Sequence, residues 1–204
     1  MKRIVAFGCS HTFGMGLEDC FLGEEQKFKS PKTSSKFAWP NLLANRFNVD
    51  CYNQSIPGGS NFEILQKIIE HEYTKDDIVV VGWTTPQRDI LKNKDGNIRI
   101  AAYALDDRIK IDTLLLGSSE LNVKQANRKY FDIHSDYDMM YKSWLCQYTA
   151  GLHLTAKKIP FHFSTAWGWE EISHPFQNFI SIDNFIEKYK KENKLIILFK
   201  LLIL

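Results

Sequence analysis

The sequence has few residues that could hold a fold or a site together by covalent or metal bonds. Its 204 residues include only four cysteines, widely spaced and without a C-x-x-C pair. The six histidines never occur at H-x-H or H-x-x-x-H spacing, which metal ligands often adopt. We therefore expect reduced thiols, as in a cytoplasmic protein, with no metal site and no cofactor.

Strong charge and long hydrophobic segments are also lacking. The formal net charge is only +2 and the basic residues are scattered, so we expect no nucleic-acid partner. The apolar end of the chain, about 194–204, is shorter than the ~20 residues that span a bilayer, and we expect no membrane partner. This end is either a buried last element or the mark of a truncated chain, and both interpretations stay open.

The composition that remains is typical of one globular domain: 44% of residues are hydrophobic and 25% are charged. β-Branched and aromatic runs alternate with helical patterns along the chain. We expect strands at 2–7, 49–53, 76–83 and 159–164, and helices at 39–47, from about 61, around 141–152 and at 182–193. This alternation predicts an α/β fold, a three-layer α/β/α sandwich with a central, mainly parallel sheet.

Two further features refine this single-domain prediction over residues 1–204. The weakly patterned stretch at about 92–135 is interpreted as an insertion into the domain. Ser60 and Glu63 have the spacing of a capping box, which predicts a helix start. We expect the apolar face of that helix to contain Phe62, Leu65, Ile69 and Tyr73.

Three loops follow predicted strands, and each combines small residues with hydroxyl or amide side chains. They are GCSHTFGMG (8–16), SIPGGSN (55–61) and GWTTPQR (82–88). In open α/β sheets, ligands bind in the crevice beyond the carboxyl ends of the strands. The three loops together therefore predict a site at that edge of the sheet.

Ser10 in the first loop has two interpretations on the residues alone. It is a nucleophile presented at the end of a strand, or Ser10 or Thr12 caps a short helix. A nucleophilic serine needs a base and N–H groups that face the oxyanion. A phosphate-binding loop is disfavoured, because G-x-x-x-x-G-K-[ST] does not occur.

The order of GCSHT near residue 10, NQSIPGGSN after the second strand and VVVGWT at the third resembles the SGNH/GDSL hydrolase superfamily. The pattern is most similar to SGNH-like proteins encoded by phages. The resemblance covers residues 1–90 well and the remainder loosely. It implies a flavodoxin-like fold and a serine esterase that uses an acyl-enzyme intermediate.

The resemblance also implies roles for individual residues. Ser10 would be the nucleophile, and the backbone N–H groups of Ser10 and Gly58 would face the oxyanion. Thr84 stands where the family has an asparagine that donates a third hydrogen bond. Asn61 and His11 would contact substrate. Arg88 would either hold a polar or anionic substrate group or form a surface ion pair.

The base of the reaction has a weaker match. The family ends with D-x-x-H, and the comparable stretch here is EISHP, with His174 as base and Glu171 as its orienting group. The implied substrate is a small-molecule or glycan ester, such as an O-acyl group on a glycan. The alternative is a catalytically impaired member of the fold that binds a glycan or a protein partner.

Overall fold

The computed structural model describes residues 3–20, 33–93, 96–101 and 120–165. The predicted helix at 182–193, Glu171, His174 and the apolar end lie outside these residues. The elements in chain order are β1 (Arg3–Gly8), α1 (Ser10–Phe13), α2 (Trp39–Phe47), β2 (Asp50–Asn53), α3 (Asn61–Glu70), β3 (Asp77–Trp83), β4 (Arg88–Asn93), β5 (Gly96–Ala101), α5 (Glu120–Ile133), α6 (Asp136–Ala156) and β6 (Phe161–Thr165).

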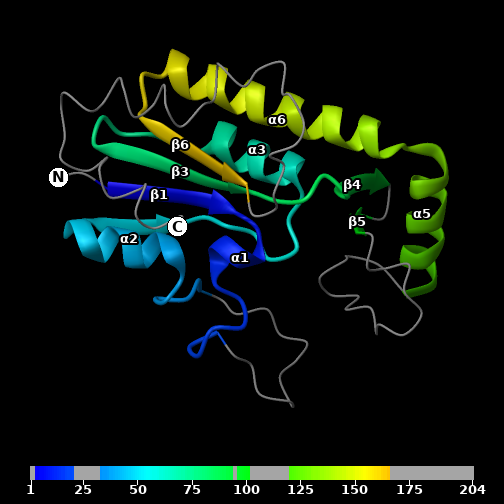
Figure 1. The fold of residues 1–204 in the computed structure, drawn as a ribbon, viewed down its shortest axis with the longest axis horizontal. Coiled ribbons are helices and arrows are strands. Elements are labelled where there is room, and N and C mark those ends of the chain that lie inside the picture. Colours follow the sequence, from blue (N-terminus) through cyan, green and yellow to red (C-terminus); the bar gives the residue numbers. More distant parts are fainter. Residues whose placement is uncertain (1–2, 21–32, 94–95, 102–119, 166–204) are drawn as a thin grey trace.

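A four-stranded parallel sheet forms the centre of the molecule, with strand order β2-β1-β3-β6 (Figure 1). The chain leaves β1 for β2 on one side and then crosses to β3 on the other. The order therefore reverses between β1 and β3, which is the switch point of a flavodoxin-like sheet. The α/β fold predicted from the alternating pattern is confirmed.

Alternation along the buried strands sends side chains to both faces of the sheet. Ile4 and Ala6 of β1 pack with Leu43 and Ala44 of α2 on one face. Their neighbours on β1 point the other way, into a second cluster that α3 and α6 cover. The larger members of this second cluster include Phe7, Val79, Val81, Trp83, Ile64, Ile68, Leu154 and Phe163. The three layers are visible in Figure 1.

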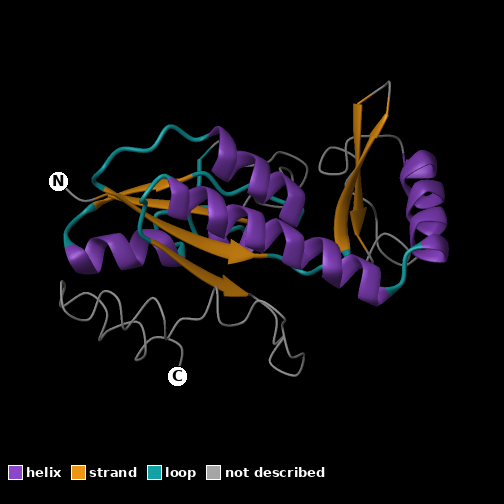
Figure 2. Ribbon diagram, turned by 90° about the horizontal axis from the view of Figure 1, so that it is seen from above, coloured by secondary structure: helices purple, strands orange, loops and turns teal. Residues whose placement is uncertain are grey.

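Strands β4 and β5 form an antiparallel hairpin outside the central sheet. The hairpin and α5 have a hydrophobic cluster of their own, which includes Ile100, Val123 and Tyr130. Figure 2 shows the hairpin and α5 at one end of the molecule, with α6 running from them along the sheet. Met139 of α6 belongs to this cluster, whereas Leu154 of the same helix belongs to the second cluster, between the sheet and helices α3 and α6.

Helix α3 begins as the sequence predicts and buries a different face from the one expected. Ser60 Oγ accepts from the Glu63 backbone N–H and Glu63 Oε2 accepts from the Ser60 N–H, so the capping box is confirmed. Phe62 and Ile69, however, are each 45% exposed. The helix buries Leu65, as predicted, together with Ile64 and Ile68, because these residues face the sheet. Tyr73 lies beyond the end of α3 and packs against the same cluster.

Three further observations concern the four cysteines, metal ligands and the membrane. All four cysteines are free thiols. Within the described ranges, no group of three or more histidine, cysteine, aspartate or glutamate residues is placed to hold a metal ion. None of the helices that the structure describes is long and apolar enough to cross a membrane.

Candidate functional site at the carboxyl edge of the sheet

Two glycines lie opposite each other where β1 and β3 end. Gly8 pairs with Gly82 in the parallel register, and both are buried. The side chain of Thr12 lies over the pair, and a Cβ added to either glycine would overlap its hydroxyl. Glycine is therefore required at both strand ends so that the turn after β1 can pack down onto the sheet.

Ser10 is the first residue of the short helix α1 at this switch point. The Phe13 N–H donates to the Cys9 carbonyl (2.9 Å), and the Gly14 N–H donates to the Ser10 carbonyl (3.0 Å). Gly14 ends the turn with a left-handed φ of 86°. The N–H of Ser10 itself lies in the first turn, where a helix offers it no partner. Ser10 is partly exposed, and the turn places it at the carboxyl edge of the sheet, two residues after the end of β1.

The second loop is held against the same edge by hydrogen bonds to the first. The Ile56 N–H donates to the Gly8 carbonyl (2.8 Å), and Asn53 Nδ2 donates to the Thr12 carbonyl (2.8 Å). Gly58 follows in this loop with a φ of +70°, a conformation that favours glycine. The loops that carry Ser10 and Gly58 are therefore brought together, as their sequence positions predict.

A cation from the hairpin lies beside the glycine loop. Arg99 of β5 forms an ion pair with Glu63, with Nη2 3.0 Å from Oε1, and its Nη1 donates to the Pro57 carbonyl at 3.5 Å. A Cβ on Gly58 would lie 3.8 Å from Arg99 Nη1. Because Glu63 also caps the Ser60 N–H, Arg99 connects the hairpin, the loop and the start of α3. The sequence alone does not indicate this role, because Arg99 lies in the weakly patterned stretch at about 92–135 and in none of the three loops.

Thr84 directly follows β3, and its backbone is held by the side chain of Asn61. The Thr84 N–H donates to Asn61 Oδ1 (2.9 Å), and Asn61 Nδ2 donates to the Thr84 carbonyl (3.0 Å). Asn61 Nδ2 also donates to Ser143 Oγ of α6. Asn61 is 3% exposed and Thr84 is 1% exposed. The Thr84 hydroxyl is buried and has no hydrogen-bond partner within the described part of the chain.

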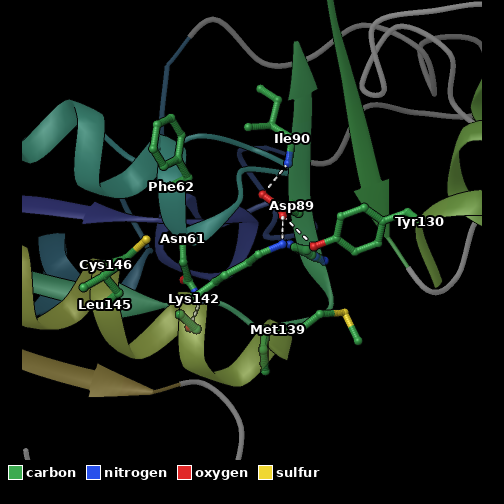
Figure 3. Close-up of a pocket in the computed structure, with 12 residues that line it drawn as sticks. Asn61, Phe62, Asp89, Ile90, Tyr130, Met139, Lys142, Leu145 and Cys146 are labelled. Carbon is green, nitrogen blue, oxygen red and sulfur yellow. Dashed lines mark hydrogen bonds and ion pairs between the residues drawn. The ribbon is translucent and has the colours of Figure 1, made fainter. Parts of the chain in front are cut away.

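Next to Asn61 lies a pocket of about 440 Å³, enclosed by α3, β4, α5 and α6 (Figure 3). Its volume lies in the range of small-molecule sites. Its apolar lining consists of Phe62, Pro86, Ile90, Met139, Leu145 and Cys146. Ser10 is not among the lining residues, and the Asn61–Thr84 pair lies between the pocket and the strand end.

Asp89 contacts two other polar side chains of the pocket, Tyr130 and Lys142. Tyr130 Oη donates to Asp89 Oδ2 (2.5 Å), and Lys142 Nζ lies 3.9 Å from the same oxygen. Lys142 also pairs with Asp138 at 3.2 Å. Burial and the hydrogen bond to Asp89 raise the pKa of the Tyr130 phenol well above its usual range. Burial and Asp89 raise the pKa of Cys146 to about 12, so this lining thiol stays protonated at neutral pH.

Arg88 also lines the pocket, from the first position of β4. Its backbone N–H donates to the Thr85 carbonyl (3.2 Å). Its guanidinium makes neither a hydrogen bond nor an ion pair with any residue that the structure describes, and Nη1 is buried. Of the two roles predicted for Arg88, the surface ion pair is therefore not found within the described ranges.

The remaining predicted residues lie as follows. His11 is exposed beside Ser10 in the same turn. Glu171 and His174 lie outside the described residues, so their positions stay predictions. Within the described ranges, no histidine is hydrogen-bonded to Ser10. Asp89, Tyr130 and Lys142 were not predicted at the site, because none of them belongs to a motif: Lys142 lies in the helix expected around 141–152, and Tyr130 in the stretch interpreted as an insertion.

Comparisons with known proteins found similarity in structure alone. No family model matches the chain, and no curated protein matches it. AlinE4, an SGNH-hydrolase family esterase, has 16% identity and a TM-score of 0.42, over 97% of this chain and 77% of its own. A carbohydrate esterase has 16% identity and a TM-score of 0.40, over 95% of this chain and 70% of its own.

Proposed function

We propose that this protein is an SGNH-type serine hydrolase that cleaves an ester. The observation that carries the proposal is the placement of Ser10 at the switch point between β1 and β3, with the Gly58 loop hydrogen-bonded beside it. In open α/β sheets this crevice is where ligands bind. The order of the three loop motifs, which resembles phage-encoded SGNH-like proteins, supports the same function.

In the proposed reaction, Ser10 Oγ attacks the carbonyl carbon of the ester as its proton passes to a base. The tetrahedral intermediate collapses, the alcohol leaves with that proton, and an acyl group remains on Ser10. Water, deprotonated by the same base, then releases the acid and restores the serine. His174 is proposed as the base and Glu171 as the residue that orients it.

The negative charge of the intermediate needs donors that are fixed before the reaction. The N–H groups of Ser10 and Gly58 are the proposed donors, supported by the turn and by the positive φ of Gly58. The contacts of Arg99 with the Pro57 carbonyl and with Glu63 support a fixed position for this loop. Thr84 is proposed as a third, weaker donor, because its buried hydroxyl has no other partner in the described structure.

The proposed substrate is a small-molecule or glycan ester, with an O-acyl group on a glycan as the preferred class. The substrate class rests on the family resemblance. His11, exposed next to Ser10, and Asn61 and Arg88, which line the neighbouring pocket, are the proposed substrate-facing residues.

Hydrolysis of a short-chain p-nitrophenyl ester tests the proposal. We expect turnover by the parent chain, loss of turnover in both Ser10→Ala and His174→Ala, and normal turnover in the control Ser34→Ala. Loss in Ser10→Ala alone would keep the nucleophile and exclude His174 as base. Undiminished turnover in Ser10→Ala would overturn the proposed function.

A second candidate function is a binding module that retains the fold without catalysis. It is favoured by Thr84, which replaces the asparagine of the resemblance and whose hydroxyl is buried. A fluorophosphonate probe separates the two functions, because only an activated serine reacts with it. Labelling of the parent at residue 10 supports the enzyme, whereas an unlabelled but folded parent supports the binding module.

A further inference from the structure

We propose that the pocket beside Asn61 binds the carboxylate end of a small, otherwise apolar organic anion, held by Arg88. The proposal rests on the proposed function in one respect: the anion would be part of an ester substrate, so that the ester carries a free carboxylate. Binding of the anion itself requires no catalysis by Ser10.

The shape and lining of the pocket set the size and polarity of the ligand. A volume of about 440 Å³ accommodates a ligand the size of a single ring with a short chain. Six of the twelve lining residues are apolar, and Figure 3 shows Phe62, Ile90 and Leu145 on different sides of the space. The body of the ligand is therefore apolar.

The charges of the pocket set the charge of the ligand. Lys142 is already engaged by Asp138 at 3.2 Å and by Asp89 at 3.9 Å, and Asp89 also accepts from Tyr130. Arg88 has no such partner among the described residues. Because Lys142 is paired with these carboxylates, the Arg88 guanidinium is the positive charge of the lining that has no counter-ion among the described residues. A monoanion balances it, and a guanidinium matches the two oxygens of a carboxylate.

The pocket is also connected to the carboxyl edge of the sheet through one of its lining residues. Asn61 lines it and is hydrogen-bonded to Thr84, which directly follows β3. Thr84 is two residues after Gly82, which faces Gly8 at the turn that carries Ser10. An ester with its carboxylate at Arg88 would therefore extend toward the proposed nucleophile along the end of the sheet.

Calorimetric titration with 4-phenylbutyrate and with its neutral analogue 4-phenylbutanol tests the proposal on the full chain. We expect the parent to bind the carboxylate at least about tenfold more tightly than the alcohol, since hydrogen bonds to charged groups are the strong ones. Arg88→Met should reduce this preference to about twofold or less, and Arg88→Lys should retain part of it. The control Arg46→Met, an exposed arginine on α2 at the opposite face of the sheet, should leave it unchanged.

A second variant locates the ligand without altering charge. Leu145 lines the pocket and is 52% exposed, so Leu145→Trp fills the space without disturbing the core. We expect it to weaken both ligands by a similar factor. Equal affinities in the parent, a preference that survives Arg88→Met in a folded protein, or unchanged binding in Leu145→Trp would each overturn the proposal.

The Ser10→Ala variant separates this inference from the proposed function. It should bind 4-phenylbutyrate as the parent does. Binding with the expected preference but no ester turnover in the parent would refute the esterase and keep the pocket. Turnover of p-nitrophenyl esters without any preference for the carboxylate would refute the pocket and keep the esterase.

Discussion

Asn61 and Thr84 are joined by two hydrogen bonds that run in opposite directions, so that the side chain of one residue satisfies both backbone groups of the other. This pair fastens the first turn of α3 to the residue after β3. Asn61 also reaches Ser143 of α6. One buried amide therefore sets the positions of three elements around the edge of the sheet and one wall of the pocket.

Replacing Asn61 should destabilise the protein strongly. Asn61→Ala leaves the buried Thr84 N–H and carbonyl without partners, and we expect a loss of about 2–3 kcal/mol in the free energy of unfolding. Urea unfolding measures it. The control Gln66→Ala removes an exposed hydrogen bond to Glu70 on the same helix and should cost less than about 0.5 kcal/mol. Similar losses in both variants would contradict the role assigned to Asn61.

Because Thr12 packs against Gly82, we expect the effect of Gly82→Ala on stability to depend on the side chain at position 12. Gly82→Ala should cost about 1–3 kcal/mol, because the new Cβ overlaps the Thr12 hydroxyl. Adding Thr12→Ala should recover most of this loss, since the next atoms lie 3.6 Å or more away. A double-mutant cycle measures the coupling.

Gly8→Ala is the matched control for that cycle. A Cβ on Gly8 would lie 2.9 Å from the Gly82 carbonyl oxygen, which is backbone and stays in place. Thr12→Ala should therefore leave most of the Gly8→Ala defect. A Gly82→Ala loss that persists in the Thr12→Ala background would show that overlap with the Thr12 hydroxyl is not its cause.

Arg99 is predicted to position the Gly58 loop for the proposed reaction. We expect Arg99→Met to lower kcat about tenfold or more, because the loop loses its contact to the hairpin. Its melting temperature should change little, since the ion pair with Glu63 is partly exposed and such pairs stabilise weakly. Arg99→Lys should recover part of kcat. A fall in melting temperature with kcat unchanged in the folded fraction would assign Arg99 a structural role only.

His162 predicts a loss of stability at acidic pH. Burial lowers the pKa of this histidine, which is 5% exposed on β6, to about 4, whereas in the unfolded chain it titrates near 6.5. The unfolded state therefore binds a proton first as the pH falls. Stability from this group is complete above about pH 6.5 and declines towards pH 4, by on the order of 3 kcal/mol.

Comparison with His162→Gln isolates that contribution. The variant carries no ionisable group at 162, so its free energy of unfolding should fall less between pH 7 and pH 4 than that of the parent. Burial also lowers the pKa values of His71 and His153, but both proteins retain these residues. Parallel pH profiles for the two proteins would refute the prediction.

Local patterns were sufficient to predict the sheet and its three loops. The buried strands are dense in β-branched residues, and the capping box at Ser60 is a contact between neighbours in the chain. The buried face of α3 was predicted wrongly in part, because the helix has two apolar stripes that share Leu65. One contains Phe62 and Ile69, and the other contains Ile64 and Ile68. The two stripes are adjacent on the helix, and only packing against the sheet decides between them.

Contacts between distant segments could not be predicted in this way. Arg99 meets Glu63 across 36 positions of the chain, and Tyr130 meets Asp89 across 41. Neither pair has a spacing signature, because the hairpin and α5 determine which side chains meet. Asp89 and Tyr130 both line the pocket, so this part of its wall becomes visible only with the fold.

The hydrophobic cluster of the hairpin and α5 is separate from the cluster that α3 and α6 form on the sheet, and this separation affects how the protein could evolve. Among the described helices, α6 contributes buried residues to both clusters, through Met139 at one end and Leu154 at the other. Substitutions in the hairpin or in α5 can therefore reshape the wall that meets a ligand while the frame around Ser10 keeps its packing. New ligand preferences would be accessible by mutation without passing through unfolded intermediates.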